Sequence, residues 1–126
     1  MTEKEQPTLI ALVDDDESVR ESLPDLLSML GFSTRPFASA EAFLESDATS
    51  NTRCLISDVS MPQMSGPQLQ YEVNRRWPHL PIIFITGRHD PSLRAALLAR
   101  GAVECLFKPL SEKELLLALH NAMTTW

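Results

Sequence analysis

Three consecutive carboxylates, Asp14, Asp15 and Asp16, follow directly after the apolar run at residues 8–13. Adjacent like charges repel, and each carboxylate resists removal from water, so the cluster needs a positive partner. Two or three carboxylates and a backbone carbonyl suit Mg²⁺, which keeps several of its own waters when it binds to protein. The sequence therefore predicts a site for a hard cation at the end of this run.

Other polar side chains end three further apolar runs. These residues are Asp58, Thr86 and Lys108. Taken singly, each would more often be a turn, capping or solvated loop residue. A cation next to a lone lysine and a threonine hydroxyl, however, suggests a site for a phosphoryl group. These residues could form one site only if the fold brings the ends of their runs together.

Short apolar runs alternate with helical patterns along the chain. Strands are expected at 8–13, 32–37, 54–59, 81–86 and 104–107, and helices at 17–30, 39–46, after Ser65, at 90–101 and at 111–123. Five strands alternating with five helices predict a parallel sheet covered on both faces. Ligands of such sheets bind outside the carboxyl ends of the strands. The polar residues that end the runs would therefore meet at one edge.

The helix starts have clear capping signals. We expect N-caps at Asp16, Ser39, Ser65, Asp90 and Ser111, with Gln68 and Glu114 completing two capping boxes. Pro24 conflicts with the first helical pattern because it removes one helix hydrogen bond. We expect a kink or a late helix start there.

Composition narrows the class of protein. The 126 residues, 44% hydrophobic and 22% charged, suit one domain with its core at about 8–123. No apolar run approaches the roughly 20 residues of a membrane span, and the polar N-terminus resembles no targeting signal, so we expect a cytoplasmic location and no membrane contact. The net charge of −6 argues against direct nucleic-acid binding.

Four stretches carry a resemblance to a known family. "LVDDDESVRESL", "ISDVSMPQMSG", "FITG" and "FKP" together resemble a CheY-like response-regulator receiver domain, and "MPQMSG" and "ITG" are most similar to FixJ-type receivers. The resemblance extends from about Thr8 to about Met123. It implies an α/β, doubly wound, flavodoxin-like sheet of five parallel strands in the order 2-1-3-4-5, with five helices.

The resemblance also implies roles for the polar residues. Asp58 would accept a phosphoryl group from a sensor histidine kinase, and Thr86 and Lys108 would hold phosphoryl oxygens. The Mg²⁺ ligands would be Asp14, Asp15, Asp58 and the backbone carbonyl of Ser60. The bond from Lys108 to Pro109 is expected to be cis. Such a protein catalyses only its own phosphorylation and dephosphorylation.

One position departs from the family pattern. Family members commonly carry Tyr or Phe three residues before the lysine, where this chain has Cys105. In the family that ring turns inward when phosphorylation pulls the threonine inward. Phe107 lies on the same side of its strand as Cys105. We expect weaker or rerouted coupling, with Gly87 as the compliant point of the loop after Thr86.

The two cysteines lack the spacing of metal ligands. In the implied strand order, one strand separates Cys54 from Cys105. Two strand spacings place them roughly 9–10 Å apart, beyond the roughly 7 Å Cα limit for a disulfide. Both are expected to be buried and reduced.

Two other functions remain open. A metal-dependent aspartyl phosphohydrolase of the haloacid-dehalogenase type would want an aspartate two residues after Asp58, where this chain has Ser60. A degenerate receiver would bind a partner without being phosphorylated. The intact set of site residues argues against this function; the set is Asp15, Asp58, Thr86 and Lys108. Partner binding, a homodimer or an output domain would use the surface of the fourth helix, fifth strand and fifth helix.

Overall fold

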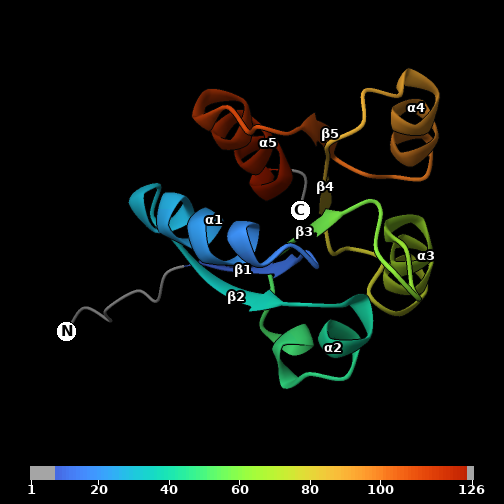
Figure 1. Ribbon diagram of the computed structural model, residues 1–126. Helices are drawn as coiled ribbons and strands as arrows, with labels where there is room; N and C mark the ends of the chain where they lie inside the picture. The colour runs from blue at the N-terminus through green and yellow to red at the C-terminus, as the bar shows by residue number, and fades with distance from the viewer. Residues whose placement is uncertain (1–7, 125–126) are drawn as a thin grey trace.

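A computed structural model describes residues 8–124 of the chain as a five-stranded sheet flanked by helices (Figure 1). Every paired strand is parallel to its neighbour, and the order is β2-β1-β3-β4-β5. The strands are β1 (Thr8–Val13), β2 (Phe32–Phe37), β3 (Cys54–Asp58), β4 (Ile82–Thr86) and β5 (Glu104–Phe107). This arrangement confirms the predicted fold class and strand order.

The helices form a layer on each face of the sheet. Their bounds are α1 (Glu17–Met29), α2 (Ala40–Leu44), α3 (Gly66–Arg76), α4 (Pro91–Ala99) and α5 (Glu112–Thr124). Helices α1 and α5 cover one face, whereas α2, α3 and α4 cover the other (Figure 1). A short 3-10 helix, η1 (Asp47–Ser50), was not predicted from the sequence.

Each helical layer encloses its own hydrophobic cluster, and β1 contributes to both. Ile10 and Leu12 pack with the buried side chains of α1 and α5, whereas Ala11 and Val13 pack with those of α2, α3 and α4. All four are completely buried. Burial on both faces explains why the strand is a continuous apolar run rather than an alternating one.

Side-chain caps begin the helices where the sequence predicts them. Asp16 accepts a hydrogen bond from the backbone N–H of Ser18, and Ser65 and Gln68 form the complete capping box of α3. The expected caps at Ser39, Asp90 and Ser111 also accept backbone hydrogen bonds.

Pro24 does not delay the start of the first helix, so that one of the two expectations for this residue is wrong. Helix α1 begins at Glu17 and carries Pro24 in its interior. The cap at Asp16 and the burial of Leu23 and Leu27, on either side of the proline, keep this segment helical. Packing therefore outweighs the hydrogen bond that the proline removes.

The cysteines occupy different layers of the core. Cys54 packs on the side of α1 and α5, and Cys105 packs on the side of α2, α3 and α4. Both are buried free thiols, as expected, and β4 lies between their strands. Burial raises the pKa of the Cys54 thiol to about 12, so it is uncharged at neutral pH.

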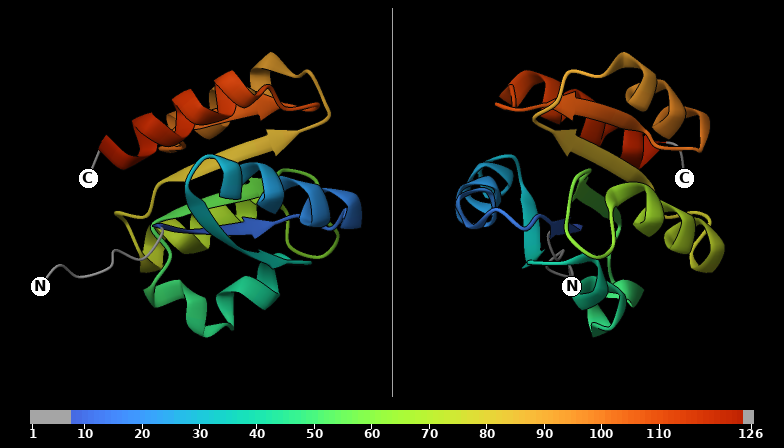
Figure 2. Two further views of the ribbon diagram at one scale, coloured as in Figure 1. Left: turned by 90° about the vertical axis from the view of Figure 1, so that its left-hand side faces the viewer. Right: turned by 45° about the vertical axis from the view of Figure 1, so that its right-hand side comes forward.

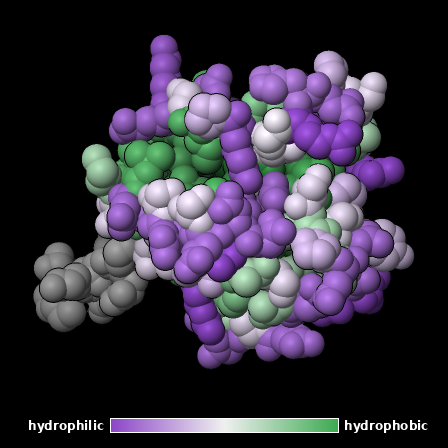
Figure 3. Space-filling view, in the orientation of Figure 1, coloured by the Kyte–Doolittle hydropathy of each residue, from purple (hydrophilic) through white to green (hydrophobic). Residues whose placement is uncertain are grey.

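Hydrophilic side chains occupy the middle of the face seen in Figure 3, and hydrophobic ones are visible between α1 and α5. Large exposed apolar side chains include Met29, Leu116 and Leu117. Across residues 8–124, no helix has both the length and the apolar character needed to cross a membrane.

Candidate functional site

The polar residues singled out in the sequence lie at one edge of the sheet. All five strands run in the same direction, so their carboxyl ends face the same way (Figure 2). Asp58 and Thr86 are the last residues of β3 and β4, and Asp14 and Lys108 directly follow β1 and β5. Parallel pairing thus gathers residues that are up to 94 positions apart in the chain.

Three carboxylates form a compact cluster at this edge. One oxygen from each of Asp14, Asp15 and Asp58 lies within 4.8 Å of the other two. Asp14 is completely buried, Asp58 is 7% exposed, and Asp15 is exposed to solvent. Hard carboxylate oxygens converging from two strands, with one open side, are a donor set that fits a divalent cation such as Mg²⁺.

Lys108 brings a positive charge to the carboxylates. Its Nζ lies 3.1 Å from Asp14 Oδ2 and 3.6 Å from Asp58 Oδ1. Desolvation disfavours the ammonium, but the hydrogen bond and charge of Asp14 and the charge of Asp58 outweigh it, and the pKa of Lys108 is raised. The lysine therefore stays protonated. The peptide bond from Lys108 to Pro109 is cis, as expected.

Asp58 is the most perturbed acid of the site. Burial, followed by the charge of Asp14, raises its pKa to about 6, although Lys108 and the backbone N–H of Val59 act in the opposite direction. The Val59 N–H donates to Asp58 Oδ1 over 2.9 Å. The single lysine therefore does not fully compensate the crowded carboxylates, and a second cation would favour the ionised form.

Backbone and side-chain contacts hold Asp14 in place. Its Oδ1 accepts a hydrogen bond of 2.9 Å from the N–H of Asp16, and its backbone carbonyl accepts one of 2.9 Å from Arg20 Nη1. Sequence reasoning did not find Arg20. Arg20 lies one turn into α1, and its side chain reaches back to the loop before the helix. Its contact with Asp14 therefore depends on a helix that begins at Glu17.

Gly66 was also missed, and it controls how closely α3 approaches the site. A Cβ at this position would lie 2.7 Å from the carbonyl oxygen of Asp58 and 2.9 Å from the ring of Phe84. The Gly66 N–H donates to the carbonyl of Val59 over 2.8 Å. Only glycine allows this contact between the start of α3 and the end of β3.

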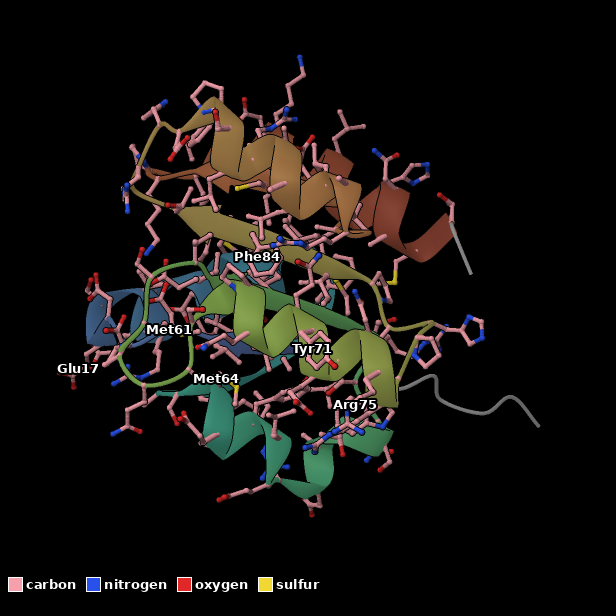
Figure 4. All side chains as sticks on the ribbon, turned by 90° about the vertical axis from the view of Figure 1, so that its right-hand side faces the viewer. Glu17, Met61, Met64, Tyr71, Arg75 and Phe84 are labelled. Carbon is pink, nitrogen blue, oxygen red and sulfur yellow. The ribbon has the colours of Figure 1, made fainter. Side chains whose placement is uncertain are left out.

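The loop between β3 and α3 borders the site. Met61 and Met64 lie on this loop (Figure 4) and pack against the core on the α3 side. Ser60, the predicted carbonyl ligand, is exposed at the beginning of the loop, two residues after Asp58.

Thr86 lies on the strand next to that of Asp58. Asp58 pairs with Ile85, the residue before Thr86. The buried Thr86 hydroxyl accepts a hydrogen bond of 3.1 Å from the N–H of Arg88, whereas within residues 8–124 no hydrogen bond joins it to the carboxylates. The structure thus brings Asp14, Asp15, Asp58 and Lys108 into one cluster, with Thr86 beside it.

Comparison with known proteins agrees with this geometry. A family described as "Response regulator receiver domain" matches residues 10–120. The chain is 38% identical over 119 residues to the response regulator protein TodT of Pseudomonas putida. The aligned stretch covers 94% of this chain and 52% of that protein. It is 34% identical over 113 residues to the transcriptional regulatory protein FixJ of Rhizobium meliloti, covering 90% and 55% of the two chains.

Solved structures show the same architecture. The crystal structure of FixJ-N superposes with a TM-score of 0.84 at 33% identity, covering 97% of this chain and 98% of that chain. The chain spans about half the length of the curated relatives that it matches. The match over residues 10–120, the strand order and the relatives together show that this chain belongs to the response regulator receiver domain family.

Proposed function

We propose that the protein is the phosphoacceptor of a cytoplasmic two-component phosphorelay, with Asp58 as the residue that is phosphorylated. The observation that carries this proposal is the position of Asp58, which shares a cluster with Asp14 and Asp15 and lies 3.6 Å from the Lys108 ammonium. Residues from about 8 to 123 would act as one phosphoacceptor domain. The family is a signalling family rather than a catalytic one.

The transfer would use few groups of the protein. An oxygen of the Asp58 carboxylate attacks the phosphorus of a phosphohistidine on a sensor kinase. The new O–P bond forms while the N–P bond breaks, and the imidazole nitrogen leaves with the bonding electrons and takes a proton from solvent. Phosphoryl transfer depends mainly on positioning and charge stabilisation. Lys108 would provide charge stabilisation, and the Thr86 hydroxyl would donate to a phosphoryl oxygen.

Asp14, Asp15, Asp58 and the backbone carbonyl of Ser60 would hold Mg²⁺. The ion, when bound, neutralises charge on the carboxylates and on the phosphoryl oxygens. The raised pKa of Asp58 supports this proposal, because a site that lacks the ion holds more negative charge than Lys108 balances. Asp16 is instead committed to capping α1.

The output would be a change in partner binding. Relatives such as FixJ carry the name "Transcriptional regulatory protein", and the stretch that matches this chain covers 55% of that protein. We infer that the surface of α4, β5 and α5 contacts an output domain or a second copy, because Leu116 and Leu117 are exposed on α5. Direct nucleic-acid binding by this chain is disfavoured by its net charge of −6.

The first experiment is labelling with a small phosphodonor, acetyl phosphate, in Mg²⁺. Intact-mass spectrometry should detect one phosphoryl group on the wild type and on Asp25→Asn, a matched change at an exposed aspartate of α1. Asp58→Asn should not be labelled. Phosphate on Ser57 or Ser60 would contradict the assignment, multiple turnover of the donor would indicate a phosphohydrolase, and absence of labelling would indicate a binding module.

The second experiment tests the metal ligands. Mg²⁺ should raise the free energy of unfolding by RT ln(1 + [Mg²⁺]/Kd). Asp15→Ala should abolish most of this increase, whereas Asp16→Ala should preserve it after correction for its lost helix cap. Thermal unfolding at several Mg²⁺ concentrations measures both. An equal loss in the two variants would show that the aspartates act only as a diffuse acidic patch.

A further inference from the structure

An aromatic stack connects the loop after β4 to β5. The imidazole of His89 lies on the ring of Phe107, with centroids 4.2 Å apart and planes inclined by 18°. The other described ring pairs, such as Phe37 with Phe43 at 71°, meet edge to face within the core. His89 is exposed and Phe107 is half-buried, so this stack lies at the surface where it can open without unfolding the domain.

The stack is tied to Thr86 by backbone contacts. Phe107 is the register partner of Thr86, so their side chains lie side by side on one face of the sheet. The N–H of Lys108 donates to the Thr86 carbonyl over 2.8 Å, and the N–H of Arg88 donates to the Thr86 hydroxyl over 3.1 Å. His89 is three residues after Thr86 in the chain. It lies in a loop whose position depends on the Thr86 hydroxyl, because that hydroxyl accepts the hydrogen bond from Arg88.

Residue 105 cannot provide the same connection. Cys105 is 3% exposed and belongs to the core cluster on the α3 and α4 side, next to its register partner Phe84. Its side chain has no ring that could alternate between an inner and an outer position. Among the residues at this end of β5, Phe107 is the one whose ring contacts the loop.

We propose that the His89–Phe107 stack is the relay that reports the state of Asp58 to the surface of α4, β5 and α5. This inference rests on the proposed function of Asp58. When Thr86 donates its hydroxyl to a phosphoryl oxygen and is drawn toward β3, the N–H of Arg88 follows its acceptor. The loop then carries the imidazole away from Phe107.

Opening of the stack would change a specific groove. A cavity of about 510 Å³ between α4, β5 and α5 is lined by residues that include Pro91, Arg94, Cys105, Phe107, Leu117 and Asn121. Phe107 forms part of both the stack and this groove. Release of the ring would therefore alter the surface that a partner meets, although position 105 holds only a small side chain.

The stack should favour the resting arrangement. A conformation that binds a phosphoryl group only after the stack opens has a lower apparent affinity, in proportion to the population of the open form. Aromatic pairs of this kind typically change an equilibrium by about two- to tenfold. Removing either ring should therefore tighten binding of a phosphoryl mimic by about this factor.

The test measures the affinity for beryllofluoride in saturating Mg²⁺, with the backbone amide of Thr86 followed by NMR. We expect about two- to tenfold tighter binding for His89→Ala and for Phe107→Leu, and no further gain in the double variant. His89→Tyr keeps a ring and should match the wild type. His120→Ala, which removes an exposed histidine of α5, should also match it.

Ring-proton shifts provide the direct measurement. Phe107 should shift the His89 ring protons in the resting protein, and beryllofluoride should remove that shift. If the amides of Asp58 and Thr86 respond but those ring protons do not, or if His89→Ala leaves the affinity unchanged, the relay is overturned and the proposed function stands. If neither amide responds to beryllofluoride, both proposals are overturned.

Discussion

Two neighbouring regions of this sheet edge are held together in opposite ways. On the β1 and β3 side, the buried carboxylates of Asp14 and Asp58 lie near one ammonium, and burial, followed by the charge of Asp14, raises the pKa of Asp58 to about 6. On the β4 and β5 side, a threonine hydroxyl, a loop N–H and a pair of stacked rings make weak contacts near the surface. The first region accumulates unfavourable charge, whereas the second is made of contacts that are easily exchanged.

The difference indicates how a small domain can separate chemistry from signalling. Under the proposed function the acidic region would have to be rigid, because a phosphoryl group is stabilised only by groups already in position. The proposed relay would require two arrangements of the loop region close in free energy, because a ligand shifts an equilibrium only by its differential affinity for the two states. Substitutions matched between the two regions test this contrast.

The largest expected effect on the free energy of unfolding is that of a substitution at Gly66, for which Gly87 provides the matched comparison. Gly66→Ala places a Cβ 2.7 Å from the Asp58 carbonyl and should lower the free energy of unfolding by about 3 kcal/mol. Gly87→Ala, in the loop after β4, meets no atom within 4 Å and should change it by less than about 0.5 kcal/mol. Urea unfolding measures both variants, and similar losses would contradict a rigid acidic edge beside a tolerant loop.

The two regions also offer a pair of ionic contacts for comparison. Lys108→Met leaves the buried Asp14 and Asp58 without their cation and should cost about 2 kcal/mol at pH 7. Arg94→Met breaks a partly exposed contact of 2.6 Å to Glu104 and should cost at most about 0.5 kcal/mol. If chemical denaturation without Mg²⁺ ranks these two variants in the reverse order, the acidic cluster is less crowded than proposed.

The smallest effect concerns pH. The pKa of Asp58 is about 6 in the folded chain, above its value of about 3.9 in unfolded peptides, so the folded state binds the proton more tightly. Protonated Asp58 therefore contributes fully to the stability of the folded state below about pH 4. As the pH rises to about 6 this contribution is lost, and the free energy of unfolding falls by about 1–2 kcal/mol after allowance for solvent.

Asp58→Asn removes this titration. The variant should match the wild type at about pH 4 and be more stable than it at pH 7, by about 1–2 kcal/mol in the absence of Mg²⁺. Denaturation curves recorded across this range measure the difference, and Asp25→Asn serves as the control. A difference that does not change with pH would show that Asp58 titrates normally.

The sequence by itself determined the element order and the edge at which the site lies. Apolar runs bounded by capping residues such as Ser65 and Asp90 predict strands and helices because burial and caps act over a few residues. The carboxyl ends of parallel strands must then meet, so Asp14 and Asp58 were predicted as neighbours. The strand order required more than these local patterns and came from resemblance to a family.

Only the tertiary structure decided how the site is held and how it could signal. The fold places the His89 ring on Phe107, and Arg20 and Gly66 contact the acidic edge in ways that no local pattern indicates. These contacts join residues from different elements, and their distances depend on how helices pack on the sheet. Packing also sets the burial that raises the pKa of Asp58, because desolvation depends on the atoms that surround a group and not on its neighbours in sequence.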